Sequence, residues 1–207
     1  MEILVLCTAN QCRSPMAQVL LGEQLQARGI ASSVSSAGFR TGGRPAAAHA
    51  QVTVAERGLS LAGHVSRAVT PALLEAADLV VTMERRHVQK AVLLESRCWP
   101  VCFSLGDLLV RGQEVGPRWD GEAVGGWVNR LHADRQPADV VGASIGGDVA
   151  DPIGQPLRRF RATAKSLATA CDTLADLLAP GPTPVVASPL PTGWRGHWST
   201  RRSASPR

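Results

Sequence analysis

The architecture of this chain follows from one segment, Ile3-Leu4-Val5-Leu6-Cys7-Thr8-Ala9-Asn10-Gln11-Cys12-Arg13-Ser14-Pro15. Its first four residues are apolar and predict a short buried strand that ends at Cys7. Ser14 and Pro15 predict the start of a helix, because serine is a preferred N-cap and proline suits the first helical position. A loop ahead of a helix N-terminus gathers backbone N–H groups and the positive end of the helix dipole. We therefore expect this loop to bind an oxyanion.

Two side chains of the segment suggest chemistry at that oxyanion. Arg13 can donate a pair of parallel hydrogen bonds to two oxygens, and Cys7 lies below as a candidate nucleophile. The positive surroundings also favour the thiolate form of a cysteine. A cysteine at a strand end is often only a small buried hydrophobic residue, and Cys-x5-Arg alone also arises by chance. The preceding strand and the following helix favour the catalytic interpretation.

Composition sets the broad class. The chain has 207 residues, 44% hydrophobic and 19% charged, which predicts one globular domain plus extensions. No apolar run is long enough to span a membrane, and a strand at the N-terminus argues against a signal peptide, so a cytoplasmic location is expected. Five scattered cysteines without paired CxxC units predict free thiols and no metal site.

The net charge of +5 does not indicate nucleic-acid binding. Four arginines and no acids follow Pro180, which leaves the rest of the chain near +1. The same tail contains six of the fourteen prolines and few aliphatic residues, so residues 180–207 are predicted to be disordered. The domain is expected over residues 1–179.

Alternating apolar segments predict four strands separated by helices, and hence an α/β fold with a parallel sheet. The stretch 111–147 is less regular and reads as an insertion, with one short helix across 126–133. Ligands bind such sheets at the carboxyl ends of strands, where Cys7 lies. The expected strands are 32–37, 78–83 and 99–104 besides the first; the expected helices are 14–28, 46–57, 70–77, 84–95 and 156–178.

Several segments together resemble the low-molecular-weight protein tyrosine phosphatases and their arsenate-reductase relatives. The resemblance covers about residues 1–110 and 148–178. It implies a flavodoxin-like three-layer sandwich and a phosphatase, independent of metals and cofactors, that hydrolyses phosphotyrosine proteins or small aryl phosphates through a phosphocysteine. The motifs are Val5–Pro15, Ser36-Ala37-Gly38, His64-Val65-Ser66-Arg67, Ala77–Met83 and Asp151-Pro152.

The resemblance implies roles for the matching residues. Cys7 would attack phosphorus, Arg13 would hold the equatorial oxygens, and Asp151 would be the general acid and then the base. Ser14 would also donate a hydrogen bond to the Cys7 sulfur. The remaining substrate-binding positions would be Thr8, Ala9, Asn10, Gln11, Cys12 and Ser14, with support of the loop from Asn10, Ser36 and His64.

Some of these positions have plainer interpretations. Asp-Pro often starts a turn, although the helix that follows favours the acid role for Asp151; the neighbouring Asp148 is expected to be a solvated loop residue. Cys12 matches a thiol that in relatives forms a reversible disulfide with the nucleophile, and it could equally be a small packed side chain. His64 alone would read as a surface histidine.

The chain also departs from the family pattern. Ile153 and Gly154 follow Asp-Pro where the family often has an aromatic pair, and the chain has no tyrosine. An aromatic wall would then come from Phe39 or from a tryptophan of the insertion. Trp119, Trp127 and Leu131 could form a lid or fill the core, and the core is favoured.

Two other functions compete with a phosphatase. A thiol-linked arsenate reductase would need resolving thiols, and the only further candidates, Cys98 and Cys102, are expected on one face of the fourth strand rather than on a mobile segment. A non-catalytic phosphate-binding module, anchored to an acidic partner through the arginine-rich tail, would not need the complete set of Cys7, Arg13 and Asp151.

Overall fold

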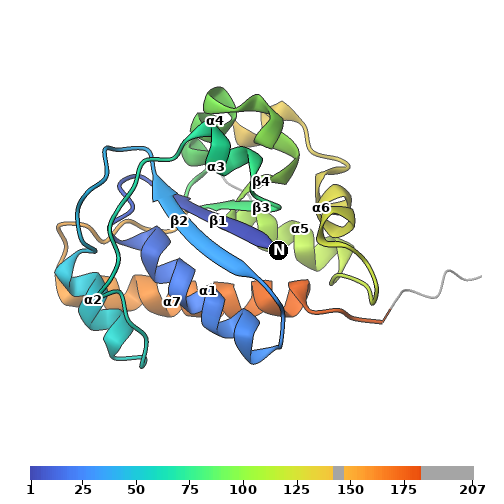
Figure 1. Cartoon of the computed structure of the whole chain (residues 1–207). Helices are drawn as coiled ribbons and strands as arrows, with labels where there is room; N and C mark the ends of the chain where they lie inside the picture. Colours follow the sequence, from blue (N-terminus) through green and yellow to red (C-terminus); the bar gives the residue numbers. More distant parts are fainter. Residues whose placement is uncertain (142–146, 183–207) are drawn as a thin grey trace, which may run out of the picture.

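Four parallel strands form the central sheet of the structure, a computed structural model that describes residues 1–141 and 147–182 (Figure 1). The strands pair in the order β2-β1-β3-β4. Cys7 at the end of β1 lies opposite Gly38, and Leu6 lies opposite Thr82. The carboxyl ends of three strands therefore meet around Cys7. The strands are β1 (Glu2–Cys7), β2 (Ser33–Gly38), β3 (Leu79–Thr82) and β4 (Cys102–Ser104).

Helices cover both faces of the sheet, which confirms the predicted three-layer sandwich. Alternate residues of β1 belong to two separate cores: Ile3 and Val5 to the larger one, Leu4 and Leu6 to the smaller. The larger core is closed mainly by α1 (Arg13–Ala27), α2 (Ala48–Ala55) and α7 (Leu157–Leu178), and α1 and α7 lie along the same face (Figure 1). The smaller core lies under α3 (Pro71–Glu75) and α4 (Arg85–Leu94).

The start of α1 differs from the prediction. Its N-cap residue is Cys12, which makes no side-chain cap hydrogen bond, and Ser14 is already inside the first turn. The Ser14 hydroxyl lies 3.0 Å from the Cys7 Sγ, so it serves the cysteine and not the helix end. The other predicted boundaries of the first three strands, of the helices up to residue 95 and of the last helix agree with the structure to within two residues.

A helix was missed in the stretch after β4. Helix α5 (Leu105–Val115) begins at a Ser104 cap, whose hydroxyl accepts a hydrogen bond from the Asp107 N–H. Glycines obscure its apolar pattern, and Gly112 lets α7 pack closely: a Cβ there would lie 2.5 Å from the Leu177 Cδ1 atom, so the leucine side chain would have to shift. It is followed by α6 (Val124–His132) and the 3-10 turn η2 (Pro137–Val140).

Two of the three large apolar residues singled out in the insertion, Trp127 and Leu131, fill the core as favoured from the sequence, whereas Trp119 does not. Trp127 and Leu131 are fully buried in the larger core. The Trp127 Nε1–H donates to the Gly116 carbonyl at 3.0 Å. Trp119 is half-buried and packs its ring 4.1 Å from the Arg130 guanidinium carbon.

The fourth strand is shorter than predicted. Residues Ser96–Val101 form the 3-10 helix η1, and only Cys102–Ser104 pairs with β3. Pro100 has no N–H to donate to a ladder, which is consistent with a start after it. Cys98 therefore lies in η1 and Cys102 in β4, so the prediction that both occupy one face of the strand was wrong. Both are buried in the smaller core.

Parts of two predicted segments lie outside the described residues. These parts are residues 183–207 of the tail predicted over 180–207, and residues 142–146 of the loop predicted over 142–147. Across residues 1–141 and 147–182, no helix combines the length and the apolar character needed to cross a bilayer.

Candidate active site

Cys7 occupies the floor of the candidate site. It is the last residue of β1 and is only 3% exposed. The strand directs its sulfur toward the first turn of α1, where the Ser14 hydroxyl shares a hydrogen bond with it at 3.0 Å. Residues 8–12 connect the two elements, as predicted for an oxyanion-binding loop.

Asn10 holds this loop in shape from its centre. Its φ of 53° is the only left-handed value of a non-glycine residue in the described part of the chain. The side-chain amide donates to the hydroxyls of Ser14 at 3.0 Å and Ser36 at 2.8 Å. Its Oδ1 accepts from the Arg67 N–H at 3.0 Å, and its carbonyl lies 2.7 Å from the His64 Nε2. The sequence-predicted supports Asn10, Ser36 and His64 therefore come together, and His64 is not a free surface residue.

The Arg13 guanidinium is buried and hydrogen-bonded to four neighbours, of which the most distant is the Thr8 hydroxyl, 3.4 Å from Nη2. Its side chain is 1% exposed. Nη1 donates to the Glu84 Oε1 at 2.5 Å and to the Val149 carbonyl at 2.9 Å. Nη2 donates to the Asp151 Oδ2 at 2.6 Å. Nε is buried and has no partner among the described residues. Such an unsatisfied donor beside Cys7 is what an oxyanion would complete.

Glu84 was missed by the sequence analysis. It lies two residues after the end of β3, at the sheet edge where Cys7 lies, and it balances the buried Arg13 charge. Although its burial works in the opposite direction, hydrogen bonds from Arg86 and Arg13 hold the pKa of Glu84 below its usual value. An acid soon after a buried strand was the available signal.

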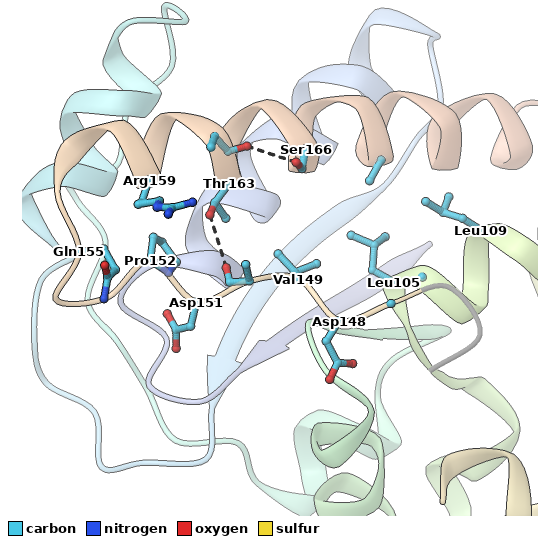
Figure 2. Close-up of a pocket in the computed structure, with 15 residues that line it drawn as sticks. Leu105, Leu109, Asp148, Val149, Asp151, Pro152, Gln155, Arg159, Thr163 and Ser166 are labelled. Atoms are coloured by element: carbon cyan, nitrogen blue, oxygen red, sulfur yellow. Dashed lines mark hydrogen bonds between the residues drawn. The ribbon is translucent and has the colours of Figure 1, made fainter. Parts of the chain in front are cut away.

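The segment 147–152 carries Asp151 across the edge of the sheet. The Val149 N–H donates to the Met83 carbonyl at 2.9 Å, and the Thr163 hydroxyl donates to the Ala150 carbonyl at 3.4 Å. Figure 2 shows the Asp151 carboxylate directed away from α7, on the other side of the segment from Thr163. Asp148 is exposed as expected, but it also accepts a hydrogen bond from the Arg85 N–H at 2.9 Å.

His87 is a second residue that the sequence did not reveal. Its Nε2 lies 3.0 Å from the Thr8 hydroxyl, and its ring stacks on Phe39 with centroids 5.5 Å apart. Burial lowers the pKa of His87 to about 4, and the positive charge of Arg13 acts in the same direction. The ring is therefore neutral at physiological pH and supports the loop as a hydrogen-bond partner.

The unfolding free energy is expected to decrease as the pH falls from 6.5 to 4. In the unfolded chain His87 is protonated near the ordinary histidine pKa of 6.5, whereas in the folded chain it is protonated only near 4. This difference in proton binding lowers the unfolding free energy by up to about 3 kcal/mol at acidic pH. His87→Gln should flatten this part of the profile in urea unfolding followed by tryptophan fluorescence. Burial also lowers the pKa of His132, so His132→Gln is the matched control. Equal slopes for His87→Gln and the unmodified protein would contradict the assignment.

A cleft of about 820 Å³ opens above Cys7 and Arg13. Phe39 and Ile153 line it, so Phe39 is one aromatic wall, as expected, and none of its lining residues comes from the tryptophans of the insertion. A second cavity, of about 600 Å³, lies behind the Asp151 segment against α5 and α7 (Figure 2).

Within the described residues, no group of three or more His, Cys, Asp or Glu side chains could hold a metal ion.

All five cysteines are free and buried. Burial raises the pKa of the Cys12 thiol, and the nearby Asp151 carboxylate adds to the effect. Burial likewise raises the pKa of Cys171 to about 12. Cys171 packs in the larger core on α7, as predicted. A redox role for Cys12 remains a prediction.

Comparison with known proteins places this geometry in a family. Residues 2–100 match the family model described as low molecular weight phosphotyrosine protein phosphatase. Over these residues, a little less than half of the chain, the sequence is similar to this family. A solved low molecular weight protein tyrosine phosphatase from T. tengcongensis is 26% identical and superposes with a TM-score of 0.66, over 86% of this chain and 99% of that one.

Other proteins that are similar to this chain carry a different substrate name. A curated protein-arginine-phosphatase from Bacillus subtilis is 40% identical over 90 residues, which are 43% of this chain and 59% of that protein. The alignment thus spans about six-tenths of the relative's length. A structure titled as the YwlE arginine phosphatase, in which a cysteine-to-serine variant carries a phosphorylated active-site serine, is 28% identical with a TM-score of 0.64, over 84% of this chain and 93% of that one.

Proposed function

We propose that this chain is a cysteine-dependent, metal-independent protein phosphatase that acts through a phosphocysteine intermediate. One observation carries the proposal: a cysteine sulfur, a buried arginine with an unsatisfied N–H and a carboxylate meet at one cleft. Arg13 and Asp151 are 138 residues apart in the sequence. The phosphorylated serine of the YwlE variant supports attack on phosphorus from the position that Cys7 would occupy.

The first half-reaction transfers the phosphoryl group to Cys7. The thiolate attacks phosphorus, an S–P bond forms and the bond from phosphorus to the leaving atom breaks. The loop N–H groups and the Arg13 Nε and Nη2 would hold the three equatorial oxygens, which is where charge must be stabilised. For this, Nη2 exchanges its present partner Asp151 for a phosphate oxygen. The exchange frees the Asp151 carboxyl group to deliver a proton to the leaving atom.

The second half-reaction releases phosphate. The Asp151 carboxylate takes a proton from a water molecule as the water oxygen attacks phosphorus, and the S–P bond breaks. The Ser14 hydroxyl, 3.0 Å from the sulfur, would donate a hydrogen bond to the departing thiolate. Arginine and backbone amides supply the positive charge for both steps.

The substrate is proposed to be a phosphotyrosine protein or a small aryl phosphate, with phosphoarginine as a second candidate. Phe39 offers one aromatic wall to a phenol ring. The lining also includes Ile153, followed by Gly154, in place of an aromatic pair. The missing aromatic pair and the name of the Bacillus subtilis relative are the reasons for the second candidate. In a phosphoarginine, the leaving atom would be a guanidinium nitrogen that Asp151 protonates.

Turnover of three substrates tests the proposal and separates the two candidates. The unmodified protein is assayed with para-nitrophenyl phosphate and with two peptides that differ only in carrying phosphotyrosine or phosphoarginine. The buffer contains a thiol reductant and a chelator. Hydrolysis of any of the three supports the phosphatase, and the ratio of the two peptide kcat/KM values assigns the substrate. Phosphate binding without any turnover would instead support a non-catalytic phosphate-binding module.

Asp151→Asn is expected to lower kcat by about 10²- to 10⁴-fold, because an amide cannot deliver or accept the proton. The loss should be larger for a phosphotyrosine peptide than for para-nitrophenyl phosphate, whose leaving group needs less protonation. Asp148→Asn is the matched control, since an amide oxygen can still accept from the Arg85 N–H. Equal activity of Asp151→Asn and the control would remove Asp151 from the acid role.

Arsenate reduction is not favoured. A reductase would relay oxidation from Cys7 to resolving thiols, but Cys98 and Cys102 are buried in the smaller core and lie in η1 and β4. Five free thiols and a thiolate mechanism suit a reducing compartment, and we propose a cytoplasmic location on that ground. The substitutions Cys98→Ser and Cys102→Ser should leave phosphatase turnover in place.

A further inference from the structure

Two arginines of the cleft lining, Arg40 and Arg44, have side chains that are not engaged within the described part of the protein. Both follow β2, line the cleft and are exposed. Neither side chain has a hydrogen-bond or ion-pair partner within residues 1–141 and 147–182. Their backbone is fixed, because the Arg44 N–H donates to the Ser66 hydroxyl at 3.0 Å and the Gly43 N–H to the Ser66 carbonyl at 2.7 Å.

Arginines elsewhere on the surface are mostly neutralised by carboxylates. Arg28 pairs with Asp172 and Asp176, and Arg161 pairs with Glu56. Further pairs are Arg97 with Glu75, Arg111 with Asp107 and Arg130 with Glu122. Arg57, Arg158 and Arg159 are also exposed and have no carboxylate partner among the described residues, but they lie outside the cleft lining, so Arg40 and Arg44 are distinguished by their place at the cleft.

The phosphate site does not use this charge. Arg13 and the loop amides account for the oxyanion, and Glu84 and Asp151 balance Arg13 within the protein. Arg86 also lines the cleft, but it is paired with Glu84. Asp151 is the only acid among the lining residues. Arg40 and Arg44 thus present two free guanidinium groups to whatever extends from the mouth of the cleft.

We propose that Arg40 and Arg44 form a subsite for carboxylate side chains next to the phosphorylated residue of the substrate. The inference rests on the proposed phosphatase function and narrows its substrate class to proteins phosphorylated within an acidic stretch. Guanidinium groups bind carboxylates through paired N–H donors. Such groups at the rim of a cleft also attract an anionic substrate before it docks. The subsite should act on binding, and hence on KM.

Three phosphopeptides with the same phosphorylated residue test the subsite. The residues that flank the phosphorylated position are glutamate, glutamine or lysine, and the phosphorylated residue is the one the unmodified protein hydrolyses faster. At 0.15 M salt we expect kcat/KM to be about tenfold higher for the glutamate peptide than for the lysine peptide, mainly through KM. The double variant Arg40→Glu/Arg44→Glu should reverse that order.

The matched control is Arg57→Glu/Lys165→Glu, which makes the same change in net charge at exposed residues outside the cleft lining. It should keep the preference of the unmodified protein. If both double variants lose the preference equally, net charge explains it and the subsite is wrong. If neither loses it, the subsite is also wrong. Circular dichroism and the melting temperature establish that each variant is folded.

A binding measurement tests the subsite even if the chain proves not to be a phosphatase. Fluorescence anisotropy with labelled glutamate and lysine phosphopeptides is measured on Cys7→Ser, with and without the Arg40 and Arg44 changes. A glutamate preference that disappears with those changes supports the subsite even without turnover. Equal affinity of Cys7→Ser for the two peptides would overturn it, whether or not the unmodified protein is a phosphatase.

Discussion

Replacing Cys7 with serine is expected to lower kcat for para-nitrophenyl phosphate by about 10⁴-fold or more, because the hydroxyl is a far weaker nucleophile than a thiolate. The substitution is nearly isosteric. A serine Oγ at the end of β1 can still share a hydrogen bond with Ser14, as the sulfur does at 3.0 Å. The fold and the loop of residues 8–12 should therefore keep their structure, and calorimetry should still detect phosphate binding. The measurement is a steady-state rate under reducing conditions, beside a phosphate titration.

Cys171→Ala is the thiol control for this experiment. Cys171 is buried in α7, and burial raises its pKa to about 12, so it has no thiolate to offer at neutral pH. Its removal should cost some stability and leave turnover in place. Comparable turnover by Cys7→Ser and Cys171→Ala would show that Cys7 is not the nucleophile and would defeat the proposed mechanism.

Arg13→Lys is expected to reduce kcat/KM by about 10²- to 10³-fold and to destabilise the protein at the same time. Lysine keeps the charge but replaces a planar set of donors by one ammonium group, so it cannot hold two phosphate oxygens in a fixed geometry. It also cannot reach Glu84, the Val149 carbonyl and Asp151 together, as Arg13 does. A buried Glu84 with a weakened partner should cost up to about 3 kcal/mol.

Arg28→Lys is the matched control, because Arg28 is paired with Asp172 and Asp176 at the surface, at the other end of α1. Its activity should remain close to that of the unmodified protein, with a loss of stability below about 1 kcal/mol. The decisive readouts are kcat/KM and the urea midpoint of both variants. If Arg13→Lys retained full kcat/KM, Arg13 would not be the oxyanion ligand.

The sheet and the phosphate loop could be predicted because the information is local. Residues 3–7 are a continuous apolar strand, and the loop and helix start follow within ten residues. Helix α5 could not be predicted with the same ease, since Gly106 and Gly112 interrupt its pattern. The packing that favours Gly112 involves Leu177, 65 positions away, whose side-chain tip occupies the space of a Cβ.

The supporting residues of the site were hidden for a related reason. Glu84 is 71 residues from Arg13, and His87 is 79 residues from Thr8. Only the strand order β2-β1-β3-β4, which sets β3 beside β1, brings the segment after β3 to the phosphate loop. Neither residue type has a spacing to Cys7 that would signal a role. Three-dimensional neighbours of this kind need the sheet order before they can be named.

The position of Asp151 in the chain also bears on how the protein is made. The ribosome releases the Cys7 loop early, whereas Asp151 emerges 138 residues after its partner Arg13. At about 5 to 20 residues per second, that interval is about seven to thirty seconds. Strand β3 is synthesised about halfway through this interval, and α7 is synthesised only after it, so the face of β1 and the surface of α1 that these elements cover stay unpaired until then. A nascent chain therefore carries the Cys7 loop well before Asp151, and the proposed catalytic pair is complete only when synthesis of the domain is almost complete.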